Sequence, residues 1–206
     1  MTIMFDFGGV IVDLDQQRCM DSFVRLGVKD IGQYIDKYRQ NGLFQQLELG
    51  NVSNADFHDA IRTLCGQDVA DEAIDAAWCD FLVDVPQYRL DFIKELRERG
   101  LRVILLSNSN EIHFGKWIVP FFEKNGGLSC YFDAVYFSHQ LHLAKPDEDI
   151  FRAVLREEQE MANNILFLDD GFNNIQTAKR LGFQTYLVRE REDWREVVKK
   201  YLNGNS

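Results

Sequence analysis

Near its N-terminus the chain reads MFDFGGV over residues 4–10, a very short apolar run that is interrupted by Asp6. Far downstream a second apolar run, ILFLDDG over residues 165–171, also ends in acid. Short apolar runs of this kind are typical of buried strands in a parallel sheet, whose faces are both covered. Because ligands bind in the crevice at the carboxyl ends of such strands, we expect both acidic motifs to lie at one crevice.

The acids of these two motifs predict a metal site. Asp6 would lie beside Asp169 and Asp170, and crowding carboxylates raises the pKa of at least one of them unless a cation neutralises their charge. Carboxylate oxygens suit a hard divalent cation. The arrangement therefore indicates Mg²⁺.

Two further strand ends carry polar groups. The apolar residues 103–106 run directly into Ser107-Asn108-Ser109-Asn110, which offers a hydroxyl, amides and backbone N–H groups to an oxyanion. The apolar residues 134–137 lead through a loop to Lys145, which precedes Pro146, where a helix can begin. Lys145 therefore supplies a fixed positive charge.

An early aspartate, a serine, a lysine and a late aspartate pair, in this order, resemble the four motifs of the haloacid dehalogenase superfamily of hydrolases. The motifs fall on Asp6, Ser107, Lys145 and Asp169-Asp170, and the resemblance covers nearly the whole chain. It implies an α/β fold with a Rossmann-like parallel-sheet core and an inserted helical cap of the C1 type. With the ELG segment at residues 48–50, the motifs look most like the small sugar-phosphate phosphatase branch, of the glucose-1-phosphate type.

The division into core and cap follows from the pattern along the chain. After Asp15 the apolar spacing changes from that of strands to that of helices, and no strand signal interrupts residues 16–85. Pro86 marks the return to alternating helices and strands. We therefore expect residues 1–15 and 86–206 to form the core and residues 16–85 to form an all-helical cap over the crevice.

The resemblance also implies roles for the acidic residues. Asp6 is expected to be the nucleophile, forming an aspartyl-phosphate that divides one hard displacement into two easier ones. The expected magnesium ligands are Asp6, the main-chain carbonyl of Gly8 and Asp170, with Asp169 beside the ion or one water away. Asn174, in the polar position that follows the acid pair, is expected to orient this loop.

The remaining motif residues are expected to bind the phosphoryl group. Ser107 and the amide of Asn108 would donate hydrogen bonds to its oxygens, and Lys145 would offset the charge of both Asp6 and the phosphate. Ser107 and Lys145 are therefore predicted, with Asp6, to be the catalytic residues.

Gly8 departs from the commonest phosphatase pattern of the superfamily. There, the second residue after the nucleophile is an aspartate that protonates the leaving alcohol and then activates water. The sugar-phosphate branch also tends to carry glycine at this position, so the acid must come from elsewhere. A cap residue such as Glu48, or the substrate itself, could supply it. His113 could also face the crevice, whereas His58, His139 and His142 have no assigned partner in the sequence.

These observations support one main hypothesis and two alternatives. The main one is a magnesium-dependent phosphomonoesterase that acts on a small soluble metabolite, such as a sugar phosphate, through Asp6. The second is metal-independent hydrolysis of a 2-haloacid, which the acid pair disfavours because uncompensated carboxylates repel an anionic substrate. The third is a slow or inactive member that binds a ligand, which the absence of an acid at Gly8 keeps open.

Composition limits the class of protein. The 206 residues suffice for one core plus an inserted subdomain, and the net charge of −10 argues against nucleic acid or an anionic membrane as a partner. The four cysteines are scattered, and no leader segment or long apolar run is evident, so the chain is expected to be cytoplasmic and reduced. The oligomeric state is not specified by the sequence.

Overall fold

A computed structural model describes residues 1–36, 38 and 40–204 of the chain. In this part of the chain, five parallel strands form one sheet in the order β3-β2-β1-β4-β5. The strands are β1 (Thr2–Phe5), β2 (Arg102–Ser107), β3 (Ala134–Phe137), β4 (Ile165–Asp169) and β5 (Gln184–Leu187). The prediction of an α/β fold with a parallel sheet is thus confirmed.

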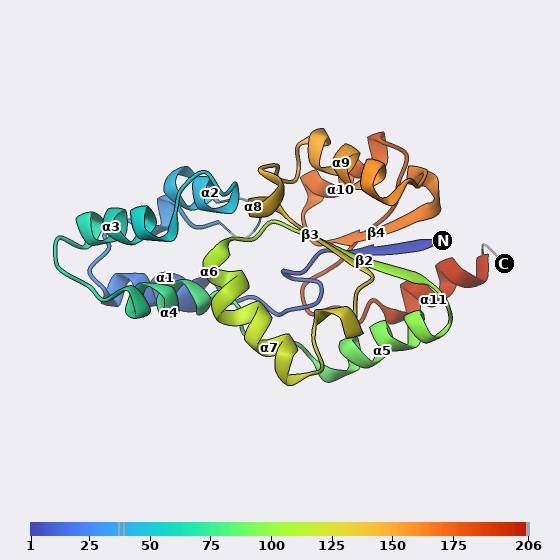
Figure 1. Cartoon of the computed structure of the whole chain (residues 1–206), viewed down its shortest axis with the longest axis horizontal. Helices are drawn as coiled ribbons and strands as arrows, with labels where there is room; N and C mark the ends of the chain where they lie inside the picture. The colour runs from blue at the N-terminus through green and yellow to red at the C-terminus, as the bar shows by residue number, and fades with distance from the viewer. Residues whose placement is uncertain (37, 39, 205–206) are drawn as a thin grey trace.

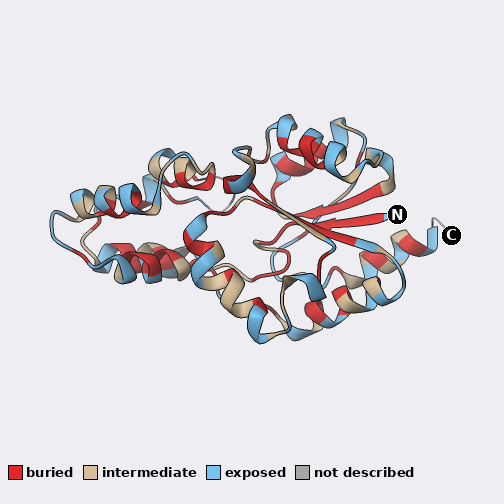
Figure 2. Cartoon of the chain, viewed as in Figure 1, coloured by how far each residue is buried: buried red, intermediate tan, exposed pale blue. Residues whose placement is uncertain are grey.

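Both faces of the sheet are buried. Along β1, Ile3 and Phe5 belong to one apolar cluster and Met4 to the other, as expected for side chains that alternate across a strand. The helices α5 (Gln87–Glu98) and α11 (Arg195–Gly204) cover one face, while α9 (Glu148–Glu158) and α10 (Phe172–Arg180) cover the other (Figures 1 and 2). Burial on two faces explains why the central strands β1, β2 and β4 are largely apolar, whereas the edge strand β5 is partly polar and more exposed.

The helices that the structure describes between β1 and α5 lie together at one end of the molecule, beyond the carboxyl ends of the strands (Figure 1). Their apolar centre is Phe44, whose ring lies 5.4 Å from Phe23, 5.1 Å from Phe57 and 4.9 Å from Trp78, centroid to centroid. Such aromatic pairs add to the stability gained from burial. The helices are α1 (Gln16–Arg25), α2 (Gly42–Glu48), α3 (Asn54–Cys65) and α4 (Asp71–Cys79), with a 3₁₀ turn η1 (Ile31–Gln33).

The two connections between this helical block and the sheet run side by side. The amide of Asp13 donates to the carbonyl of Asp84 at 2.8 Å, and the amide of Val83 donates to the carbonyl of Asp13 at 2.9 Å. The buried Arg89 of α5 donates to the carbonyl of Ile11 at 3.0 Å and to Asp13 Oδ1 at 2.8 Å. The first connection is therefore held both by the second and by the core.

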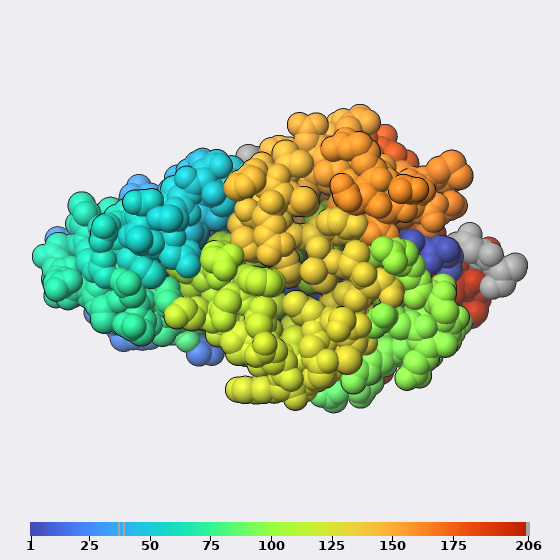
Figure 3. Space-filling view, viewed as in Figure 1, coloured from blue at the N-terminus to red at the C-terminus, as the bar shows by residue number. Residues whose placement is uncertain are grey.

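Shorter elements complete the wall that faces the helical block. In Figure 3 the blue-to-cyan surface of that block meets the green-to-gold surface around α6 and α8 on this face of the molecule. The elements of this wall are α6 (Glu111–His113), a π-helical turn η2 (Phe114–Ile118) and α8 (Ser138–Leu141). The other short elements that the structure describes are α7 (Val119–Lys124), η3 (Leu128–Cys130) and η4 (Ala162–Asn164). None of the helices that the structure describes is both long and apolar enough to traverse a bilayer.

Candidate active site

The carboxyl ends of the strands bring the predicted motif residues together. Asp6 follows β1, Ser107 ends β2 and Asp169 ends β4, so all three lie at one edge of the sheet. Lys145, from the loop between α8 and α9, reaches the same edge. Its Nζ lies 2.8 Å from Asp6 Oδ1 and 2.7 Å from Asp169 Oδ2, and it donates to the carbonyl of Leu106 at 3.0 Å. The sequence predicted this grouping, although not its individual contacts.

Charge is concentrated and poorly solvated at this point. Burial raises the pKa of Asp6 well above its usual value; Lys145 opposes this shift, whereas Asp169 and Asp170 add to it. Burial also lowers the pKa of Lys145, but its attraction to Asp169 and Asp6 outweighs this and leaves the pKa raised. The Lys145 ammonium thus pairs with only two of the three clustered carboxylates, and a bound cation would favour the ionised form of Asp6.

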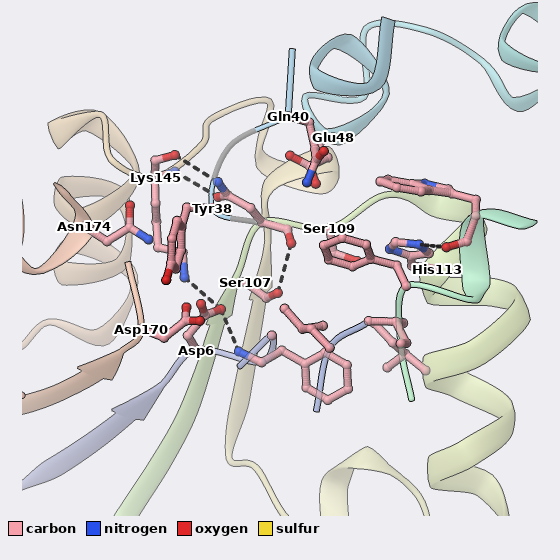
Figure 4. A pocket seen from close by; sticks show the side chains of 18 residues that line it. Asp6, Tyr38, Gln40, Glu48, Ser107, Ser109, His113, Lys145, Asp170 and Asn174 are labelled. Carbon is pink, nitrogen blue, oxygen red and sulfur yellow. Dashed lines mark hydrogen bonds and ion pairs between the residues drawn. The ribbon is translucent and has the colours of Figure 1, made fainter. Parts of the chain in front are cut away.

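The two acids of the pair have different surroundings. Asp169 is fully buried; its Oδ1 accepts from the amide of Gly171 at 2.6 Å and from Asn174 Nδ2 at 2.9 Å, while its Oδ2 is paired with Lys145. Asp170 instead lines the same cavity as Asp6 (Figure 4). Asp169 therefore holds Lys145 and the loop in place, and Asp170 presents its carboxylate to the cavity.

Residues suited to hold a cation are present. Ligand oxygens of Asp6, Asp169 and Asp170 all lie within 4.8 Å of one another. Gly8 lines the cavity beside Asp6 and Asp170. A set of carboxylates with a nearby main-chain carbonyl is the donor chemistry that Mg²⁺ prefers.

Gly9 contributes to the site in a way that was not predicted from the sequence. Its φ is +72°, a conformation that disfavours residues with a side chain, and a Cβ built there would lie 2.1 Å from Asp170 Oδ2. The backbone at Gly9 therefore makes room for the carboxylate of Asp170. The second glycine of the FDFGG segment was the available signal, since adjacent glycines next to a strand indicate close approach of the backbone to another group.

The loop after β2 is joined to the Lys145 loop. Asn108 Nδ2 donates to the carbonyl of Lys145 at 2.9 Å, and the amide of Lys145 donates to Asn108 Oδ1 at 2.9 Å. Ser107, 2% exposed, lines the cavity with Asn108. Both polar atoms of the Asn108 side chain thus hydrogen-bond to the backbone of Lys145 and hold it in position. The backbone amide of Asn108 is therefore its candidate group for binding a ligand.

Glu48, at the C-terminal end of α2, reaches the cavity from the helical block. It lies opposite Asp6 and Asp170 in Figure 4, with Gln40 near it. Glu48 is buried, and this burial raises its pKa to about 8, against the opposing effect of Lys145. The complete lining is Asp6, Phe7, Gly8, Leu14, Tyr38, Gln40, Glu48, Trp78, Phe81, Leu82, Ser107, Asn108, Ser109, His113, Ile118, Lys145, Asp170 and Asn174.

The histidines are held by structural contacts. His113 does line the cavity, but its Nε2 donates to the carbonyl of Trp78 at 3.0 Å and its Nδ1 lies 3.2 Å from Asn110 Nδ2. Burial lowers its pKa to about 4, so it is neutral near pH 7. Outside the cavity lining, His58 is paired with Asp75, His139 with the carbonyl of Ser109, and His142 with the carbonyl of Leu49.

The family model for haloacid dehalogenase-like hydrolases matches residues 1–182. The chain belongs to this family. The prediction of the superfamily is therefore confirmed, and the four motif positions lie within the matched segment.

A curated protein and two solved structures are similar to this chain over nearly their full lengths. A D-ribitol-5-phosphate phosphatase of Bacteroides thetaiotaomicron is 38% identical over 203 residues, which cover 98% of each chain. The crystal structure of a wild-type HAD family enzyme from the same organism, in complex with magnesium and inorganic phosphate, matches with a TM-score of 0.86 and 37% identity, covering 95% of this chain and 98% of that one. The structure of a predicted HAD-like hydrolase from Porphyromonas gingivalis matches with a TM-score of 0.90 and 34% identity, covering 98% and 97%.

Proposed function

We propose that this protein is a magnesium-dependent phosphomonoesterase that acts through an aspartyl-phosphate on Asp6. The observation that carries the proposal is the position of Asp6, ion-paired with Lys145 and within one carboxylate cluster with Asp170 at the edge of a cavity. A carboxylate placed in this way can attack phosphorus while neighbouring positive charge offsets that of the phosphoryl oxygens.

The residues that would hold Mg²⁺ are Asp6, Asp170 and the carbonyl of Gly8. We place Asp169 outside the direct ligands because both of its oxygens are already hydrogen-bonded within the protein. When bound, the ion supplies charge that neutralises the carboxylates and polarises a phosphoryl oxygen. Crystals of the similar enzyme from B. thetaiotaomicron hold magnesium and phosphate, which supports this assignment.

The chain's own residues provide the remaining steps. Ser107 and the amide of Asn108 orient the phosphoryl group, and Lys145 stays charged to balance Asp6 and the phosphate. Asp169 and Asn174 fix the direction of Lys145 and of the acidic loop. We also propose that residues 16–85 act as a cap, with residues 1–15 and 86–206 as the core, so that the cavity between them is shielded from bulk solvent and admits the single water that hydrolysis needs.

The competing reactions are less well supported. Dehalogenation needs no metal, yet the carboxylate cluster around Asp6 would repel a haloacid unless a cation were bound. The ion pair between Asp6 and the buried Lys145 argues against a purely binding role. Burying these two charges costs free energy, and buried charged groups of this kind are typical of catalytic sites.

For the substrate, we propose a small polyol or sugar phosphate. The support is the 38% identity to a D-ribitol-5-phosphate phosphatase across 98% of both chains. The net charge of −10 favours a small ligand held by local cations over a nucleic acid, and we propose a cytoplasmic location for such a metabolite enzyme.

The test is hydrolysis of a panel of phosphate esters, with D-ribitol 5-phosphate, pentose phosphates, hexose phosphates and 2-chloropropionate, each with Mg²⁺ and with EDTA. We expect phosphate release from one or more polyol or sugar phosphates, dependent on Mg²⁺, and no chloride release. Chloride release in EDTA would contradict the proposal, as would a complete lack of phosphate release from a folded protein.

Substituting Gly9 tests the place of Asp170 in the metal site. We expect Gly9→Ala to weaken Mg²⁺ binding by about 10-fold to 100-fold, because its Cβ would displace the Asp170 carboxylate. Isothermal titration with Mg²⁺ measures the effect. Gly66→Ala is the matched control, since Gly66 has a similar φ of +66° with no described atom within 4 Å of a built Cβ. It should reduce stability by about 1 kcal/mol and leave Mg²⁺ affinity unchanged; equal Mg²⁺ affinities in the two variants would contradict the assignment.

A further inference from the structure

The proposed reaction needs a proton donor that the strand-end motifs do not provide. An alkoxide leaves slowly from phosphorus unless an acid protonates it as the bond breaks. Gly8 has no side chain to do this, and Leu14 fills the adjacent space, with its Cδ1 3.2 Å from a Cβ built on Gly8. The donor must therefore come from another part of the cavity.

We infer that Glu48 is the general acid and base of this reaction, an inference that rests on the proposed function. It protonates the leaving alcohol when Asp6 attacks phosphorus, and then takes a proton from the water that hydrolyses the aspartyl-phosphate.

The other titratable groups that line the cavity are committed elsewhere or poorly placed. Lys145 is ion-paired with Asp6 and Asp169, and both ring nitrogens of His113 lie against protein partners. Asp170 belongs to the carboxylate cluster of Asp6. Tyr38 is 53% exposed, in contrast to the buried Glu48. The carboxyl of Glu48 makes no hydrogen bond with any residue that the structure describes, so it is available to a substrate.

Glu48 lies on the side of the cavity where the leaving group belongs. In phosphoryl transfer the attacking and leaving oxygens are roughly in line, with phosphorus between them. Figure 4 shows Asp6 and Asp170 on one side of the cavity, Ser107 between, and Glu48 on the opposite side. A phosphate ester held at Ser107 and attacked from Asp6 directs its leaving oxygen toward Glu48.

The main chain around Glu48 is fixed to the core. Ser138 Oγ lies 2.6 Å from the carbonyl of Glu48 and donates to it, and the same Oγ accepts from the amide of Ser109 at 2.9 Å. His142 Nδ1 lies 2.9 Å from the carbonyl of Leu49. At Gly50, where φ is +67°, a built Cβ would lie 2.3 Å from the carbonyl oxygen of His139, so the backbones are in close contact. These contacts hold the end of α2 in a fixed position relative to the loop that follows Ser107.

The protonation state of Glu48 suits an acid. Burial raises its pKa to about 8, so the carboxyl is mostly protonated at pH 7 and ready to donate. The charged or titratable groups that face it or its anchor are Asp6, Tyr38, His113, Lys145 and Asp170 in the cavity, and His139 and His142 beside α8.

The two steps balance. In the first, an Asp6 oxygen bonds to phosphorus, the bond from phosphorus to the ester oxygen breaks with its electron pair on that oxygen, and the oxygen takes the proton of Glu48. In the second, water bonds to phosphorus while Glu48 takes one of its protons, and the bond between Asp6 and phosphorus breaks with its electron pair on the carboxylate. Alcohol and inorganic phosphate leave, and protonated Glu48 is restored.

The test compares two leaving groups in Glu48→Gln, an isosteric variant. D-ribitol 5-phosphate has a poor leaving group that needs the proton, whereas 4-nitrophenyl phosphate has a good one that does not. We expect hydrolysis of D-ribitol 5-phosphate, or of the best alkyl ester in the panel, to fall by about 10²-fold to 10⁴-fold. With 4-nitrophenyl phosphate, a burst of nitrophenolate should persist at a rate within a few-fold of wild type, and mass spectrometry should show phosphorylated protein, because water attack has lost its base.

A second measurement needs no variant. Turnover of the alkyl ester by wild type should fall as the pH rises through about 8, as Glu48 loses its proton, while the nitrophenolate burst should not show this limb. Glu72→Gln, an exposed glutamate of α4, is the matched control and should behave as wild type in both assays.

The outcomes distinguish a failure of the role proposed for Glu48 from a failure of the proposed phosphatase function. A Glu48→Gln variant that loses both activities equally, or that hydrolyses the alkyl ester as well as wild type does, would overturn the role of Glu48 while leaving the phosphatase intact. Selective loss of alkyl ester hydrolysis in Tyr38→Phe instead would assign the acid to Tyr38. A wild type that releases neither nitrophenolate nor phosphate would overturn the proposed function and this inference with it.

Discussion

Replacing Asp6 with asparagine should lower phosphate ester turnover by about four orders of magnitude or more while leaving the protein folded. The amide oxygen of asparagine is a poor nucleophile, so the covalent step through an aspartyl-phosphate is lost. The substitution also removes one of three clustered carboxylates, whose burial and mutual repulsion raise the pKa of Asp6. The thermal midpoint of the metal-free variant should therefore not fall far below that of wild type. Steady-state kinetics and calorimetry measure the two effects.

Asp21→Asn is the matched control for this change. Asp21 lies on the exposed face of α1 and contacts Gln17 at 2.8 Å, remote from the cavity lining. We expect it to retain wild-type turnover. Substantial turnover by Asp6→Asn would show that Asp6 is not the nucleophile, and the phosphatase mechanism proposed above would have to be abandoned.

Lys145→Met should be the most destabilising of the site substitutions. The Nζ of Lys145 pairs with both Asp6 and Asp169 and donates to Leu106, and its side chain is 1% exposed. Removing one partner of a buried ion pair leaves the other charges uncompensated, which costs about 3–5 kcal/mol. Turnover should also fall by at least about 10²-fold to 10³-fold, because the charge that offsets the phosphoryl oxygens is gone. Urea unfolding and kinetics at saturating Mg²⁺ measure the two losses.

Lys199→Met separates burial from the loss of a lysine as such. Lys199 lies on α11 and pairs with Glu196 at 2.8 Å, with 44% of its side chain exposed. An exposed pair of this kind is worth at most about 1 kcal/mol. If the two lysine variants unfolded at the same urea concentration, the ion pairs of Lys145 would not stabilise the fold as argued here.

Much of the fold could be predicted because burial on both faces of the sheet leaves a direct mark on the sequence. β1, β2 and β4 each contain an apolar run, and a polar residue, Asp6, Ser107 or Asp169, follows that run at once. Parallel strands place such groups at one edge. The grouping of Asp6, Ser107, Lys145 and the acid pair was accordingly predictable from order and spacing.

The separate roles of the residues within that group, above all those of Asp169 and Asp170, could not be predicted from the sequence. Asp169 and Asp170 are adjacent and chemically identical, and their roles differ because one side chain points toward Lys145 and the other toward the cavity. The burial of Glu48 depends on how α2 packs against α8, a contact between segments 90 residues apart. Helical periodicity describes which face of α2 is apolar, but it does not give the neighbour of its last residue.

The hydroxyl of Ser138 lies within reach of two acceptors, the carbonyl of Glu48 at 2.6 Å and the carbonyl of Ser109 at 2.9 Å, although it has one proton to give. If the end of α2 moves away from α8, that proton can turn to Ser109 and leave no buried hydroxyl without a partner. An unsatisfied buried polar group costs about 1–3 kcal/mol, so the second acceptor lowers the free energy of separation by an amount of this order. The contact that aligns Glu48 over the cavity is thus also one that can be broken and remade cheaply, as repeated admission of substrate and release of product require.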